Sequence, residues 1–146
     1  MEAPVAATAW AVTSSALRLL AREGPLPIRV VGNCMAPTLR DGEIVTVKPV
    51  RRYFPGDVIA CRQPGSGRLL MHRVLGYRRT ASRWAYLVRG DACVAHDGLI
   101  FPDHIIGRAN SVVGTGKTVA ATIPDRALAL GRWLHLGLRW LARRMT

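Results

Sequence analysis

Short runs rich in Val, Ile and Leu recur through the middle of this chain, and they constrain its fold more than any other feature. They cover residues 28–31, 44–47, 58–61, 69–77, 84–88 and 105–113. Runs of this length are typical of β-strands, and turn residues such as Asp41-Gly42 and Pro55-Gly56 separate most of them. A chain of 146 residues with 14 Gly and 9 Pro suits one domain and does not suit a helical bundle. We therefore expect a mainly β fold built on a coiled sheet.

The two ends of the chain read as helices that flank this β region. Residues 1–24 form the first segment, whose helical pattern ends at Glu23-Gly24-Pro25. Its uncharged stretch 3–17 is shorter than the roughly 20 apolar residues of a membrane span, and Glu2 stands where a secretory signal has basic residues. We expect neither a transmembrane span nor a signal peptide, but a helix that packs on the domain or lies on a membrane. The β domain then covers residues 25–123.

The tail, residues 124–146, predicts a basic amphipathic helix over 126–144. Spacing of 100° per residue gathers one broad apolar face from Leu130, Leu134, Leu138, Leu141, Trp133 and Trp140. A second face gathers Arg132, Arg139, Arg143 and His135. Such a helix can cover its own sheet or lie in the interface of an anionic membrane. We favour the covering role, because the sheet of so short a chain needs something on its open face.

The charge balance narrows the class of partner. With 21 Lys+Arg against 9 Asp+Glu the formal net charge is +12, which indicates an acidic partner, an anionic membrane or a solvated arginine-rich face. We do not expect nucleic acid as the main partner, since no recognition-helix or zinc-finger pattern is present. The stretch 114–118, Gly-Thr-Gly-Lys-Thr, lacks the first Gly of a phosphate-binding loop, where Ser111 stands. It predicts a hairpin turn, with residues 119–123 as a strand.

The cysteines are few and odd in number, which favours a reducing compartment over a disulfide framework. They are Cys34, Cys61 and Cys93. Cys93 and His96 have a spacing that metal ligands use, but the remaining Cys and His residues are isolated in sequence, so we expect no metal and no cofactor. We expect a location in the cytoplasm or at the periphery of a membrane.

Three segments carry the strongest functional signal. They read VGNCMAPTLRDGE over 31–43, LMHRVLG over 70–76 and RGDACVAHD over 89–97. They supply Cys34 at a strand-to-turn junction, His72 inside a strand and Asp97 in a Gly-flanked loop. A nucleophile, a base and an orienting acid are the parts of a catalytic triad. Spacing alone leaves the alternative open, because a lone Cys is more often a small buried apolar residue.

As a set, the segments resemble the signal peptidase I superfamily, which includes the self-cleaving LexA-type repressors. GNCMAPTLRDGE is similar to the family's first box, FPGDVIACR to its Gly-Asp-Val strand, MHRVLG to the box with the general base, and RGDACVAHD to its last box. The resemblance spans about residues 28–110 in the family's order. It points to the branch with His as the base, and to a signal-peptidase-type β domain between two helices.

The resemblance implies a role for each matching residue. Cys34 takes the place of the nucleophilic Ser, His72 that of the base and Asp97 that of the acid that supports His. Asp91 matches the other acidic position of the last box. A thiol beside an imidazole can rest as thiolate and imidazolium, so the departure from Ser is chemically sound.

Three neighbouring positions complete the expected site. Gly32 replaces a hydroxyl residue of the family, which leaves the oxyanion to backbone N–H groups, chiefly that of Cys34. Asn33 is a candidate for additional help, and Met35, next to the nucleophile, is expected as a supporting residue of the site.

The function implied is an endopeptidase that cleaves a precursor, leader or signal-like peptide bound as an extended strand. The alternatives are an inactive peptide-binding or regulatory module of the same fold, or a basic membrane or nucleic-acid adaptor.

Overall fold

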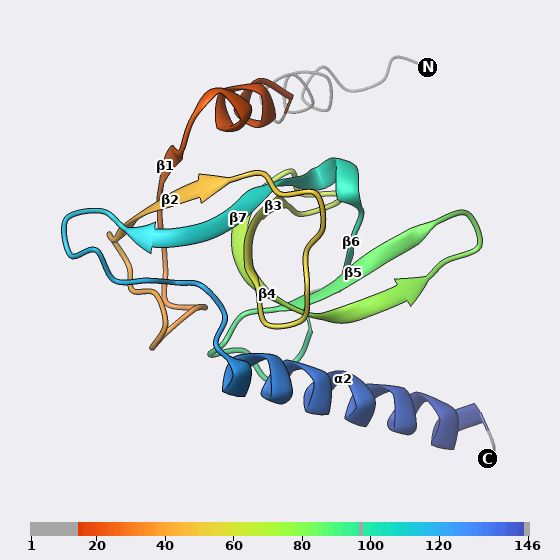
Figure 1. The fold of residues 1–146 in the computed structure, drawn as a ribbon. Coiled ribbons are helices and arrows are strands. Elements are labelled where there is room, and N and C mark those ends of the chain that lie inside the picture. The colour runs from red at the N-terminus through yellow and green to blue at the C-terminus, as the bar shows by residue number, and fades with distance from the viewer. Residues whose placement is uncertain (1–14, 97, 145–146) are drawn as a thin grey trace.

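The computed structural model describes residues 15–96 and 98–144, and within these ranges seven strands form one antiparallel sheet (Figure 1). The strands are β1 (Leu26–Arg29), β2 (Ile44–Lys48), β3 (Val58–Arg62), β4 (Leu69–Arg79), β5 (Trp84–Arg89), β6 (Gly98–Ile100) and β7 (Ile105–Val112). Their order in the sheet is β1-β2-β7-β3-β4-β5-β6, so the last strand of the chain joins the first two strands to the centre. The mainly β prediction is confirmed.

The strand predictions hold at each apolar run and fail at two places. Each run falls on a strand, but β6 was not expected, because its three residues are too few for an alternation pattern. The stretch 119–123 is not a strand. An isolated bridge joins Ser111 to Thr118, and the helix α2 (Ile123–Arg144) begins at the last residue of that stretch. The turn predicted at 114–118 is present, because Val112 N donates to Lys117 O at 2.8 Å across it.

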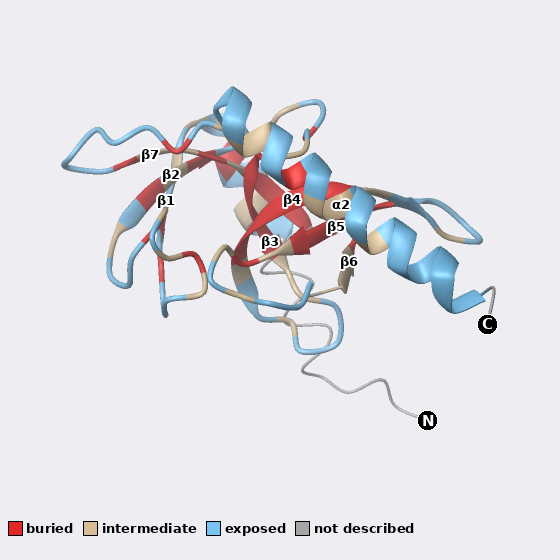
Figure 2. Cartoon of the chain, turned by 90° about the horizontal axis from the view of Figure 1, so that it is seen from below, coloured by how far each residue is buried: buried red, intermediate tan, exposed pale blue. Residues whose placement is uncertain are grey.

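The core lies on both sides of the central strand β3. Val58, Ile59, Ala60 and Cys61 are all fully buried, which explains why this strand reads as an unbroken apolar run. Val58 and Ala60 belong to a cluster with β1, β2 and β7, while Ile59 and Cys61 belong to one with β4, β5 and β6. Figure 2 shows the buried strands surrounded by exposed loops and helix.

Helical segments occur near both ends of the described chain. Residues 15–23 are helical, and Leu17 and Ala21 pack on the first core cluster. The remainder of the N-terminal helix predicted within 1–24 lies outside the described residues. Within 15–96 and 98–144, no helix has both the length and the apolar character that crossing a bilayer requires.

The C-terminal helix α2 is a single helix, as predicted, but the leucines expected to cover the sheet are not buried. It packs across β4 and β5 through Ala129, Trp133 and Leu136, which meet Leu75 and Leu87. The leucines of the predicted apolar face are largely exposed: the exposed fraction is 58% for Leu134 and 66% for Leu138. The expectation that these leucines cover the sheet is therefore wrong. Of the predicted face, Trp133 does reach the sheet, but the contact residues as a group centre about 130° around the helix from the exposed leucines. Every described residue after 136 is exposed.

Gly76 sets how closely α2 approaches β4. A Cβ at this position would lie 2.6 Å from Cγ of Trp133, whose indole N–H donates to Tyr77 O at 3.1 Å. We expect Gly76→Ala to lower the free energy of unfolding by about 1–3 kcal/mol through overpacking. In urea denaturation, Trp133→Leu in the same chain should recover part of this loss. Strictly additive effects of the two substitutions would show that the ring is not what limits the approach.

Candidate functional site

The first segment forms a closed turn between β1 and β2 that carries Cys34. Gly32 has a φ of +85°, and its N–H donates to the Asp41 carboxylate at 2.7 Å, which closes the base of the turn. Met35 and Leu39 are fully buried and anchor the turn in the core. Cys34 is half-buried at the margin of that core, so it lies near the surface in a turn that the core anchors.

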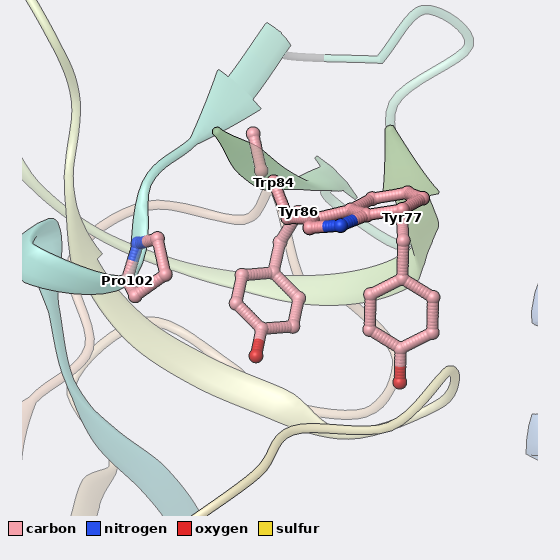
Figure 3. A pocket seen from close by; sticks show the side chains of 5 residues that line it. Tyr77, Trp84, Tyr86 and Pro102 are labelled. Atoms are coloured by element: carbon pink, nitrogen blue, oxygen red, sulfur yellow. The ribbon is translucent and has the colours of Figure 1, made fainter. Parts of the chain in front are cut away.

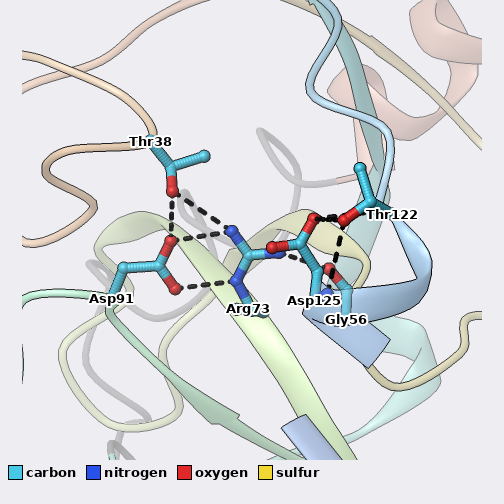
Figure 4. A network of polar contacts seen from close by, with 6 residues as sticks. All are labelled: Thr38, Gly56, Arg73, Asp91, Thr122 and Asp125. Carbon is cyan, nitrogen blue, oxygen red and sulfur yellow. Dashed lines mark hydrogen bonds and ion pairs between the residues drawn. The ribbon is translucent and has the colours of Figure 1, made fainter. Parts of the chain in front are cut away.

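An ionic network joins all three segments (Figure 4). Arg73, from the second segment, makes a bidentate pair with Asp91 of the third: Nε to Oδ1 and Nη2 to Oδ2 are both 2.7 Å. Thr38, from the first segment, donates to Asp91 Oδ2 at 2.5 Å and accepts from Arg73 Nη2 at 3.2 Å. Arg73 Nη1 donates to Gly56 O at 2.7 Å, so the network also holds the turn before β3.

The third segment also lies directly against Cys34. Ala92 N donates to Cys34 O at 2.9 Å. A Cβ on Gly90 would lie 2.6 Å from Cys34 O and 2.9 Å from Cys93 Sγ, so only Gly fits between the two loops. The loop after β5 and the turn of Cys34 are therefore in contact, as the triad hypothesis requires of these segments.

The predicted base, His72, is buried in the middle of β4. It is 3% exposed and lies opposite Ile59 in the β3–β4 ladder. The residues before and after it both contact the first segment: Met71 shares a buried cluster with Met35, and Arg73 binds Thr38. Because side chains alternate along a strand, Met71 and Arg73 share one face of β4, and His72 alternates with them. The approach of the imidazole to the Cys34 thiol stays a prediction.

The remaining predicted residues differ in their settings. Asp97 lies outside the described residues. Both Asp91 oxygens bind Arg73, which makes Asp91 a structural link between the segments. Asn33 is exposed, while its carbonyl accepts from Ala36 N at 3.1 Å. Met35 is fully buried in the core beneath the turn of Cys34.

The charges of this network shift two pKa values. Burial alone would raise the pKa of the Asp91 carboxyl, but hydrogen bonds from Arg73 and Thr38 and the charge of Arg73 outweigh it and hold that pKa below its usual range. Burial would likewise lower the pKa of Arg73, but its hydrogen bond to Asp91 and the Asp91 charge raise it overall.

These shifts predict a loss of stability in acid. A carboxyl whose folded-state pKa lies below its unfolded value stabilises the fold above the unfolded pKa of about 4, and loses that contribution as the pH falls through the folded value. Arg73 stays charged over this range, so Asp91 is the titrating member. We expect the free energy of unfolding to fall between about pH 5 and pH 2, and to fall less steeply in Asp91→Asn. Asp125→Asn should also reduce the slope, because hydrogen bonds from Thr122 lower the Asp125 pKa. An Asp91→Asn slope equal to that of the wild type would contradict the shift.

One surface hollow lies away from the three segments. A hollow of about 300 Å³ is lined by Tyr77, Trp84, Ala85, Tyr86 and Pro102 (Figure 3). None of these residues belongs to the three segments, so this hollow does not mark the Cys34 turn. Among the described residues, no group of three His, Cys, Asp or Glu side chains is placed to hold a metal ion.

Comparison with known proteins adds nothing to this geometry: no family model and no curated protein sequence matches the chain.

Sequence reasoning missed the roles of Arg73 and Thr38. Both lie inside the quoted motifs, so the signal was present as an Arg next to the proposed base and a Thr four residues after the proposed nucleophile. Their pairing required the register of β4 against β5, which brings Arg73 opposite Arg89, two residues before Asp91.

Proposed function

We propose that the chain is an endopeptidase of the signal-peptidase type, with Cys34 as nucleophile, His72 as general base and Asp97 as the acid that orients it. The observation that carries the proposal is the union of the three motif segments: Arg73, next to His72, binds Thr38 of the Cys34 turn and Asp91 of the Asp97 loop. Segments so far apart in sequence need such a link to act together.

The proposed chemistry follows from these residue types. His72 takes the proton of the Cys34 thiol, and the thiolate attacks the carbonyl carbon of the scissile peptide bond. The oxyanion accepts hydrogen bonds from backbone N–H groups, chiefly that of Cys34. Collapse of this intermediate breaks the C–N bond, and the imidazolium returns the proton to the leaving amine. A water then hydrolyses the thioester, with His72 again as base, and frees the thiol.

The sheet offers an edge for an extended peptide. β1 is an edge strand in the described sheet, and its chain runs directly on into the turn of Cys34. An extended substrate can pair with this edge through main-chain hydrogen bonds and bring its scissile bond to the turn. This supports a precursor or leader peptide as substrate rather than a folded protein.

The test is cleavage of a mixed peptide library, read by mass spectrometry. We expect cleavage at a restricted set of sites, blocked by prior alkylation with iodoacetamide and unaffected by chelators. Absence of cleavage, together with a Cys34 thiol of ordinary reactivity, would favour an inactive peptide-binding module. Cleavage that persists after alkylation would show that Cys34 is not the nucleophile.

A further inference from the structure

Helix α2 presents an apolar surface that the fold does not use. The helix is held to the domain through its inner face, Ala129, Trp133 and Leu136. On the other side, the outer face consists of Leu130, Leu134, Leu138 and Leu141, with exposed fractions of 42%, 58%, 66% and 51%. Figures 1 and 2 show α2 along one side of the molecule as a convex ridge. Such a large apolar surface on a charged chain marks an interaction site.

The charge of the helix indicates what this surface meets. Between Ile123 and Arg144 the sequence has five arginines and one aspartate. Arg132, Arg139 and Arg143 lie on the side of the helix opposite the outer face, next to the inner face. Near the end of the helix, Trp140 is 46% exposed and the Arg144 guanidinium lies 4.2 Å from its ring centroid. Leucines on one side, arginines on the opposite side and a Trp are the composition of a helix that lies in a membrane interface.

We propose that the outer face of α2 binds the surface of an anionic lipid bilayer, with the leucines in the acyl region and the arginines at the headgroups. A second copy of the chain fits this surface less well, because each copy has a formal net charge of +12 and the two would repel each other. A convex ridge also suits a planar bilayer better than a partner that needs a groove. None of the outer-face residues belongs to the three motif segments, so this proposal does not depend on peptidase activity.

The experiment measures sedimentation of the full chain with vesicles of phosphatidylcholine, with and without phosphatidylserine. We expect binding to the anionic vesicles that weakens as salt is added. Leu134→Glu should weaken this binding about tenfold or more, because the substitution removes a leucine that the bilayer would bury. Leu128→Glu is the matched control: it makes the same charge change at a leucine that is 56% exposed and lies off the outer face. It should change binding less than about threefold.

A further variant separates the contribution of charge. Arg139→Gln should weaken binding to anionic vesicles roughly fivefold and leave binding to neutral vesicles unchanged. The proposal is overturned if the wild-type chain does not bind anionic vesicles, or if Leu128→Glu weakens binding as much as Leu134→Glu. A dimer that forms without lipid and that Leu134→Glu abolishes would assign the outer face to a second copy, and would also overturn it.

Discussion

Arg73→Met should lower the free energy of unfolding by about 3–5 kcal/mol. Arg73 and Asp91 are 8% and 12% exposed, so removing the guanidinium leaves a largely buried carboxylate with Thr38 as its one remaining partner in the network. The carbonyl of Gly56 loses its donor as well. Urea denaturation followed by circular dichroism measures the loss.

Two further variants make this prediction specific. Arg83→Met breaks an ion pair with Asp103 in which the two side chains are 49% and 50% exposed. It should lower the free energy of unfolding by less than about 1 kcal/mol. The double variant Arg73→Met with Asp91→Leu removes both buried charges and should recover much of the loss. Equal costs for Arg73→Met and Arg83→Met would refute a structural role for the network.

Cys34→Ala should reduce peptide cleavage by a factor of about 10⁴ or more while the fold persists. The side chain is half-buried at a turn, so its loss leaves no large cavity, whereas the chemistry loses its nucleophile. Cleavage rates on the best library peptide and thermal unfolding curves separate these effects.

Cys93→Ala is the matched control for Cys34→Ala. Its thiol is also half-buried and lies close to Gly90, as the turn of Cys34 does, and its removal should leave cleavage within a few fold of the wild type. Cys34→Ser should retain partial activity if His72 can deprotonate a hydroxyl. Loss of cleavage in Cys93→Ala but not in Cys34→Ala would show that the nucleophile is Cys93 and not Cys34. Unfolding of Cys34→Ala would make Cys34 a core residue.

The strands could be predicted because local sequence determines them. The runs at β3 and β4 have β-branched residues and follow turns that contain Gly, and neither signal depends on distant contacts. Strand β6, with three residues, has no such local signal. Its pairing with β5 stabilises it, and pairing is a tertiary effect.

The face that α2 buries could not be predicted, because two apolar stripes run along the same helix. Ala129, Trp133 and Leu136 form one, and the exposed leucines form the other. Periodicity favours the stripe with more leucines, but the contact is decided by Gly76, which leaves room for the Trp133 ring. A glycine on a distant strand is invisible to a helical pattern.

The candidate site was predictable as segments and not as contacts. The motifs named Cys34, His72 and Asp91, but the Arg73–Asp91 pair arises from strand register and from a loop that reaches back to Thr38. A bidentate pair between segments cannot be inferred from residue types alone, since the chain has many arginines and residue type does not say which of them meets Asp91.

The most direct test of the triad is the rate at which iodoacetamide alkylates Cys34 as a function of pH, with peptide mapping to separate Cys34 from Cys93. Met71 and Arg73 contact the first segment, and side chains alternate along β4. Whether the His72 ring also reaches the Cys34 thiol therefore decides whether it can act as the base. If His72 contacts the thiol, the wild-type rate should rise with an inflection well below the free thiol value of about 8.5, and His72→Gln should return it to that value. The same profile in both proteins, with an inflection near 8.5, would contradict the Cys34–His72 pair.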